Sequence, residues 1–283
     1  MTYTYVVAPD HSVNPEPCQA EPVGPALLEI DGVSKRFGGH RAVDGVSFRV
    51  RRGSITGLIG PNGAGKTTLF NLIAGSLRPT AGRIALAGRR LDGEPPHRVL
   101  RRGVGRTFQI PRPFPEMTVL ENVMLAGRDQ RGERFWLNWL APGAVRAEER
   151  TNREKARDLL ELVGLTRWAG EPARVLSGGQ RKLLELARVL MADPQLVLLD
   201  EPAAGVNPAL LETIVARIVE LNRIGVTFLV IEHNMDVVME LCRPVLVMAN
   251  GALLLEGDPD AVRSDPRVID AYLGSGGGEV ASR

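Results

Sequence analysis

The sequence predicts an α/β fold built around a largely parallel sheet, and three observations support this. Ser54–Ile59 is an apolar strand that leads directly into a glycine-rich loop and then a helix over Lys66–Ala74. Leu196–Leu199 and Val226–Ile231 are apolar runs without alternation, as expected of strands buried on both faces of a parallel sheet. A helix over Pro208–Leu221 lies between these two strands.

The remaining elements follow from periodicity and from turn residues. Further strands are predicted at Ala26–Ile30, Val46–Val50, Ile84–Leu86 and Val104–Gln109, with a hairpin of Val245–Met248 and Ala252–Leu255 around Asn250-Gly251. Further helices are predicted at Thr118–Ala126, Glu148–Val163, Gln180–Met191 and Pro266–Leu273. Thr118 and Glu121 have the spacing of a capping box, and Gly75 and Gly164 are placed to end helices.

The chain divides into one main domain and two flanking segments. Residues 1–25 are rich in proline and lack periodicity, which predicts a disordered arm, and residues 275–283 predict a flexible tail. Residues 26–274 form the predicted domain, an α/β core interrupted by a helical subdomain at about 110–176.

Composition narrows the function classes. The chain has 35 basic and 33 acidic residues and a formal net charge of +2, which argues against a dominant nucleic-acid-binding face. Cys18 and Cys242 are too few and too far apart for a disulfide framework or a metal site, which fits a reducing cytosol. We expect neither a membrane-spanning helix nor a secretory signal, so any action at a membrane would need a partner.

Gly60-Pro61-Asn62-Gly63-Ala64-Gly65-Lys66-Thr67 has the P-loop pattern, and Thr68 continues into the helix. The glycines let the backbone amides converge on phosphate oxygens, and the helix N-terminus adds positive potential. Lys66 is predicted to reach the β- and γ-phosphates, and Thr67 to offer a hydroxyl to Mg²⁺. The flanking strand and helix make an ordinary glycine turn a poor explanation.

The strand at Leu196–Leu199 ends in Asp200-Glu201. Asp200 at the carboxyl edge of the sheet can hold Mg²⁺, and Glu201 can polarise an attacking water. Alone this pattern is weak, because many buried strands end in an acid.

Leu176-Ser177-Gly178-Gly179-Gln180 lies between the P-loop and this acidic strand end. With these motifs in this order, the chain resembles the ATP-binding cassette (ABC) family over about residues 26–274. The resemblance implies a P-loop NTPase fold, with a RecA-like core sheet, an antiparallel β subdomain and a helical insert that bears the signature. It also implies ATP and Mg²⁺ as cofactors, and hydrolysis of ATP coupled to transport.

The resemblance assigns roles to single residues. Phe37 matches the aromatic that stacks on adenine, although a lone phenylalanine is more often a core residue. Gln109 matches the glutamine that touches Mg²⁺, and His233 matches the switch histidine. Ser177 and Gly179, with Gly178 and Gln180, match the signature that contacts the nucleotide of a second subunit, so the protein should work as a pair. The segment Ala204-Gly205-Val206-Asn207 departs from the family's usual Ser-Ala-Leu-Asp, since an amide replaces the carboxylate at the dimer contact.

Longer segments are similar to the ATPase of branched-chain amino-acid importers. They are Phe37-Gly38-Gly39, Arg106-Thr107-Phe108-Gln109, Met117–Val123, Glu201–Pro208, Glu232–Met235 and Val268–Gly274, and Arg131–Ala147 resembles an insert of one such ATPase. The implied partners are transmembrane permease subunits, a second ABC ATPase subunit that is either the same chain or a paralogue, and indirectly a periplasmic substrate-binding protein. The implied location is the cytoplasmic face of the inner membrane.

Other hypotheses for the function of this chain stay open at this point. ATPases of urea or amide importers and of lipopolysaccharide exporters share much of the pattern. ABC ATPases that act on nucleic acid usually carry two cassettes or a long coiled-coil insert, whereas this chain has one P-loop and a short segment between Gln109 and Ser177. A nucleotide-binding regulator without turnover is disfavoured by the presence of Glu201.

Overall fold

The computed structural model describes residues 25–107, 112–128 and 142–274. These residues form two compact units. The sheet unit comprises residues 25–106, 195–203 and 218–274, and the helical unit comprises the described residues of 107–194 together with 204–217.

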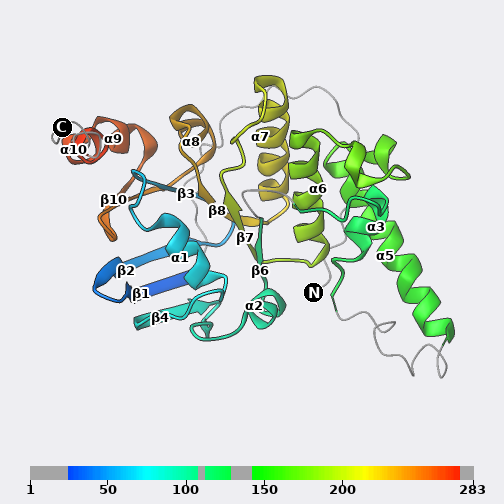
Figure 1. The fold of residues 1–283 in the computed structure, drawn as a ribbon, viewed down its shortest axis with the longest axis horizontal. Helices are drawn as coiled ribbons and strands as arrows, with labels where there is room; N and C mark the ends of the chain where they lie inside the picture. The colour runs from blue at the N-terminus through cyan, green and yellow to red at the C-terminus, as the bar shows by residue number, and fades with distance from the viewer. Residues whose placement is uncertain (1–24, 108–111, 129–141, 275–283) are drawn as a thin grey trace. The chain divides into compact units, whose positions relative to one another are not determined.

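The sheet unit contains a six-stranded sheet of order β10-β9-β3-β8-β7-β6 (Figure 1). Its strands are β3 (Ile55–Ile59), β6 (Val104–Arg106), β7 (Leu196–Asp200), β8 (Thr227–Ile231), β9 (Val245–Ala249) and β10 (Ala252–Gly257). All neighbours pair in parallel except β9 and β10, which form the predicted antiparallel hairpin. Every residue of β7 and β8 is buried, which confirms the prediction that these two strands are covered on both faces, and every residue of β3 is buried as well.

A second sheet of order β2-β1-β4-β5 is antiparallel throughout. It consists of β1 (Ala26–Phe37), β2 (His40–Arg51), β4 (Ala81–Leu86) and β5 (Arg89–Arg90), and Figure 1 shows β2, β1 and β4 side by side. The predicted strands at 26–30 and 46–50 were too short. β1 runs on to Phe37 through several register shifts, and these bulges break the alternation that marks a strand in sequence.

The helices of the sheet unit are α1 (Lys66–Ile73), α2 (Pro96–Arg102), α8 (Met235–Leu241), α9 (Pro259–Ser264) and α10 (Pro266–Gly274). α1 buries Leu69, Phe70 and Ile73 in one core with residues of both sheets, including Leu28 and Leu198. This packing fixes the helix that follows the P-loop against the strand that precedes it. The short helices α2, α8 and α9 were not predicted.

The helical unit contains α3 (Val119–Met124), α5 (Pro142–Leu162), α6 (Gly178–Met191) and the first part of α7 (Pro208–Arg223), with two 3₁₀ turns at Thr166–Trp168 and Ala173–Val175. The predicted capping box at Thr118 and Glu121 is present. Asn122 is fully buried and has its amide satisfied, because it donates to three backbone oxygens and accepts from Phe114 N.

Two predicted boundaries need correction. β6 ends at Arg106, whereas the sequence predicted a strand as far as Gln109, and Phe108 and Gln109 themselves lie outside the described residues. α5 begins at Pro142 rather than at Glu148, since proline is well tolerated in the first turn of a helix, where its missing N–H costs nothing. The predicted arm at 1–25 and the tail at 275–283 also fall almost wholly outside the described residues.

Candidate functional site

The predicted P-loop joins β3 to α1 in the sheet unit, and its lysine is turned back onto the loop. Lys66 Nζ donates hydrogen bonds to the carbonyl oxygens of Gly60 (2.6 Å) and Pro61 (2.9 Å), and the residue is only 6% exposed. Burial lowers the pKa of Lys66, while the negative charges of Glu201 and Asp200 act to raise it. The ammonium group therefore lies within the field of two carboxylates supplied by a different part of the chain.

α1 begins at a position where only glycine fits. Gly65 has φ 98°, and a Cβ atom there would lie 2.3 Å from the carbonyl oxygen of Ala42. In the described residues no side chain caps this helix, so the amides of its first turn are left for an anion. The loop is also accessible from solvent: Asn62, Gly63 and Thr67 are exposed, and Pro61 and Thr68 are partly exposed.

Asp200 and Glu201 follow β7, and His233 follows β8, its parallel neighbour. Glu201 has φ 50°, an unusual conformation for a residue with a side chain, and its N–H donates to Ile231 O at 2.9 Å. The imidazole Nε2 of His233 lies 3.0 Å from Glu201 Oε1. The structure thus brings the predicted catalytic acid and the predicted switch histidine into contact.

Asp200 has a partner that the sequence did not reveal. The guanidinium of Arg106 forms an ion pair with Asp200 Oδ2 at 3.0 Å and donates to Asn71 Oδ1 at 2.6 Å. Both members of the ion pair are largely buried, with side chains 13% and 7% exposed. In the sequence, the only indication of a role for Arg106 was its position at the start of the Arg106-Thr107-Phe108-Gln109 segment. Its guanidinium connects the acidic end of β7 to α1.

A second missed residue is Glu232, a carboxylate buried to 3% exposure between β8 and His233. It accepts hydrogen bonds from three backbone N–H groups in the sheet unit. In sequence it stands beside the predicted histidine, but nothing in the local pattern shows that its side chain is buried.

The signature segment belongs to the helical unit, where Ser177 caps α6. Ser177 Oγ accepts from Gln180 N at 3.3 Å, and the Gln180 side chain accepts from Ser177 N at 2.9 Å, so the two residues form a capping box. Gly178 is exposed, whereas Gly179 is buried against α7, where a Cβ atom would lie 2.0 Å from Leu210 Cδ2. Glycine at 179 is therefore required for the start of α6 to approach α7.

Asn207, the departure from the family pattern, caps α7. Its Oδ1 accepts from Leu210 N at 2.9 Å, and its carbonyl accepts from Leu211 N at 2.9 Å. Asn and Asp cap helices about equally well, so the exchange removes a charge without weakening the helix start.

Phe37 ends β1 and is 48% exposed, with Lys35 Nζ 5.2 Å from its ring centroid. Such exposure leaves ring surface free for a ligand and does not fit a core residue. Gln109, the remaining predicted site residue, lies outside the described residues.

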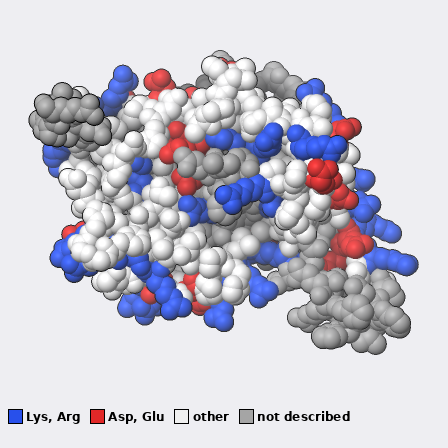
Figure 2. Space-filling view, in the orientation of Figure 1, with Lys and Arg blue, Asp and Glu red and all other residues white. Residues whose placement is uncertain are grey.

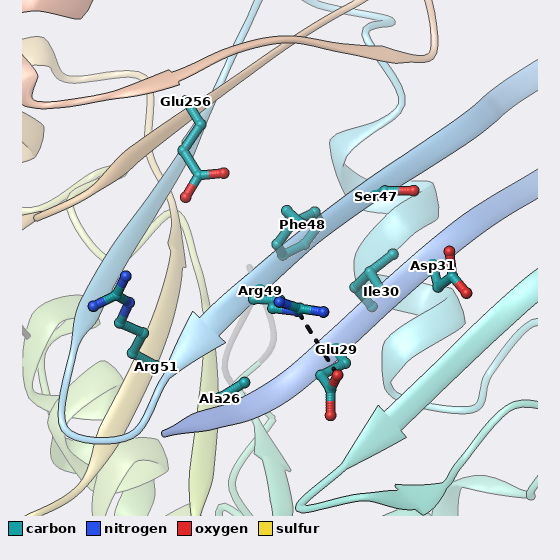
Figure 3. A pocket seen from close by; sticks show the side chains of 9 residues that line it. All are labelled: Ala26, Glu29, Ile30, Asp31, Ser47, Phe48, Arg49, Arg51 and Glu256. Atoms are coloured by element: carbon teal, nitrogen blue, oxygen red, sulfur yellow. Dashed lines mark ion pairs between the residues drawn. The ribbon is translucent and has the colours of Figure 1, made fainter. Parts of the chain in front are cut away.

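In the described residues, the surface charges and the pocket over β1 and β2 do not point to a further functional site. On the face drawn in Figure 2, the described acidic and basic side chains are interspersed. A pocket of about 650 Å³ lies over β1 and β2 and is lined by residues that include Ser47, Phe48 and Glu256, and by the Glu29–Arg49 ion pair at 3.7 Å (Figure 3). It contains none of the predicted site residues.

A P-loop between β3 and α1, with acidic and histidine side chains at the ends of the neighbouring parallel strands, defines a nucleotide-binding protein of the P-loop class. Residues 43–204 match the family described as ABC transporter, and residues 252–277 match one described as branched-chain amino acid ATP-binding cassette transporter.

Two relatives are similar over nearly their whole length. The probable branched-chain amino acid transport ATP-binding protein LivG of Archaeoglobus fulgidus is 42% identical over 254 residues, which are 90% of this chain and 98% of the relative. The high-affinity branched-chain amino acid transport ATP-binding protein BraF of Pseudomonas aeruginosa is 43% identical over 249 residues, which are 88% of this chain and 98% of the relative.

Solved structures that are similar to this chain are also ATP-binding cassettes. A nucleotide-free ATP-binding cassette from an ABC transporter is 38% identical, with a TM-score of 0.76, and the alignment covers 88% of this chain and 99% of that one. A dimeric post-hydrolysis cassette bound to ADP and phosphate is 25% identical, with a TM-score of 0.68, over 82% of this chain and 99% of that one.

The chain belongs to the ABC transporter family, and it is an ATP-binding subunit with ATPase activity coupled to transport. Cassettes of this family bind ATP or ADP. None of the helices in the described ranges has the length and apolarity that a membrane crossing requires.

The Arg106–Asp200 ion pair generates a stability prediction. Arg106→Gln should lower the free energy of unfolding by about 3 kcal/mol, because it removes the guanidinium that pairs directly with a buried carboxylate. The measurement is urea unfolding followed by circular dichroism.

The control for this variant is Arg49→Gln, which removes the cation of the exposed Glu29–Arg49 pair, whose side chains are 40% and 72% exposed. It should change stability by less than about 1 kcal/mol. Equal losses in the two variants would contradict a special role for the buried pair.

Proposed function

We propose that this chain is the ATP-hydrolysing subunit of an importer for branched-chain amino acids, with ATP binding closing a pair of ATPase domains and hydrolysis reopening it. The observation that carries the proposal is the match of residues 252–277 to the branched-chain subfamily, beyond the general ABC match. The relatives named above carry the names of branched-chain amino acid transport ATP-binding proteins, and this chain aligns with 98% of the length of each. The domain is assigned to residues 26–274, with a helical subdomain at about 110–176.

The nucleotide is bound by the P-loop residues Gly60–Thr68, with the phosphates at the start of α1. The free first-turn amides of α1 and the accessible loop support this assignment. When the nucleotide binds, the Lys66 ammonium gives up its hydrogen bonds to the Gly60 and Pro61 carbonyl oxygens and donates to phosphate oxygens instead. The exposed ring of Phe37 is assigned to the adenine base.

Mg²⁺ is assigned to Thr67, Gln109 and Asp200. A hydroxyl, an amide oxygen and a carboxylate are the hard oxygen donors that this ion prefers, so the donor set fits. Mg²⁺ bound with ATP supplies charge neutralisation on the β- and γ-phosphates. The protein's own part is to keep the Asp200 carboxylate oriented, and the contact with Arg106 serves this purpose.

Hydrolysis is assigned to Glu201, which orients and polarises the attacking water. The short contact between His233 Nε2 and Glu201 Oε1 supports this role, because a fixed imidazole restricts the carboxylate to one orientation. The Lys66 ammonium stabilises the negative charge that accumulates on the transferred phosphoryl group.

The signature residues Ser177, Gly178, Gly179 and Gln180 are assigned to the nucleotide of a second ATPase subunit. The dimeric cassette with ADP and phosphate, similar over 82% of this chain, supports a paired working form. The other partners are permease subunits in the membrane and, through them, a periplasmic substrate-binding protein. The chain is thereby held at the cytoplasmic face of the inner membrane.

Glu201→Gln tests the assigned catalytic residue. ATP turnover should fall at least about 100-fold while ATP binding is kept, because the amide cannot accept a proton from water. Phosphate release and fluorescent-ATP binding measure the two quantities. Glu212→Gln, an exposed glutamate on α7, is the matched control and should retain native turnover. Unchanged turnover in Glu201→Gln would refute the assignment.

Transport itself tests the substrate. Proteoliposomes that contain this chain and its co-purified permease should accumulate leucine or valine when ATP and the binding protein are supplied, and Glu201→Gln should abolish the uptake. Urea, an amide and lipopolysaccharide are the comparison substrates. Accumulation of urea or an amide without leucine, or export of lipopolysaccharide, would overturn the substrate assignment, and isolation with nucleic acid and no permease would overturn transport altogether.

A further inference from the structure

The buried carboxylate of Glu232 joins two loops that carry the hydrolysis residues. Its Oε1 accepts from Ala203 N at 2.6 Å, and its Oε2 accepts from His233 N at 3.0 Å and Asn234 N at 3.3 Å. Ala203 lies two residues after Glu201, on the loop that follows β7. His233 and Asn234 lie on the loop that follows β8.

These contacts continue the sheet beyond its last ladder bond. β7 and β8 pair as far as Asp200 and Ile231, and Glu201 N makes the final backbone bond, to Ile231 O. Past that point the two segments, one following β7 and the other following β8, are connected by the Glu232 side chain. A single carboxylate thus extends the parallel pairing into the loops where the chemistry takes place.

The charge of Glu232 is held by backbone donors. Within the described part of the chain, this carboxylate meets no Lys or Arg at ion-pair distance, and its hydrogen bonds all come from N–H groups. Hydrogen bonds from N–H groups to a buried ionised acceptor are strong, so the three donors offset the cost of burying the charge. The backbone segments that donate these hydrogen bonds to Glu232 are therefore held rigidly.

Glu201 needs this rigidity. Its φ of 50° is a strained conformation that persists only where the surroundings hold it, and the Ala203 amide is part of those surroundings. Glu232 therefore restrains the backbone on both sides of the 3.0 Å contact between His233 and Glu201.

We propose that Glu232 is a positioning residue for ATP hydrolysis, which locks the loop of Glu201 to the loop of His233 through the Ala203, His233 and Asn234 amides. The inference rests on the proposed function, since it assumes that Glu201 and His233 act in hydrolysis. Glu232 itself touches no substrate.

Glu232→Gln is the sharpest test because it preserves the size of the side chain. The amide has only one oxygen, so its NH₂ group must face either the Ala203 donor or the His233 and Asn234 donors, and one loop is released. We expect kcat to fall by about 10-fold or more while KM for ATP and ATP affinity change less than about twofold. The matched control is Asp92→Asn, which neutralises another buried acceptor of a backbone N–H, Ile84 N, and should leave kcat unchanged.

A double-mutant cycle separates positioning from plain stability. In a His233→Ala background, Glu232→Gln should cause little further loss of kcat, because both changes disable the same contact. Additive losses, or an unchanged kcat in Glu232→Gln, would overturn the proposal. If Glu232→Gln does not fold, Glu232→Asp keeps the charge but falls short of Ala203, and it should show the same selective loss of kcat.

Failure of both variants to fold would assign Glu232 to structure alone and overturn the positioning role. The proposed function is tested separately by the native chain and Glu201→Gln. Native turnover that depends on Glu201, with no effect of Glu232→Gln, would reject this inference only. Absence of ATP turnover in the native chain paired with its permease would reject the function itself.

Discussion

The site depends on the hydrogen-bond register of three neighbouring parallel strands. In this register Ile231 of β8 is aligned with Leu58 of β3 on one side and with Asp200 of β7 on the other. The chain leaves the sheet at the same level three times, toward the P-loop, toward Glu201 and toward His233. Ligands of open α/β sheets bind at the carboxyl ends of the strands, where these three exits lie. A slip of one residue in either pairing would separate the side chains to which the proposed function assigns hydrolysis.

The register brings charged groups together, and specific neighbours then hold them in place. Lys66 is held by loop carbonyls, Asp200 by Arg106, Glu201 by His233, and the loops of the last two by Glu232. Lys66, Asp200 and Glu232 are buried and would be costly to bury alone, and each of them has a specific hydrogen-bond or ion-pair partner. The sheet unit therefore holds these predicted site residues together at the carboxyl ends of its parallel strands.

Sequence reasoning was most accurate where a local pattern determines the structure. β3, α1, β7 and β8 were predicted to within about a residue at each end, because apolar runs and the glycine loop mark their limits. Helices α2, α8 and α9 have seven, seven and six residues, too few for a periodicity to appear. The Arg106–Asp200 and Glu232–Ala203 contacts join positions 94 and 29 residues apart, so only the fold reveals them. The roles predicted for the site residues all stay predictions: the P-loop residues, Asp200, Glu201, His233, Phe37, Gln109 and the signature residues.

The most direct test of the account is a crystal structure of the Glu201→Gln variant, which should hydrolyse ATP slowly, with ATP and Mg²⁺ bound. The account predicts phosphates at the first turn of α1, with Lys66 Nζ released from the Gly60 and Pro61 carbonyls and bonded to phosphate oxygens, and with Glu232 still bridging Ala203 and His233. Nucleotide bound elsewhere, for example in the pocket over β1 and β2, with Lys66 still on its loop carbonyls, would contradict it.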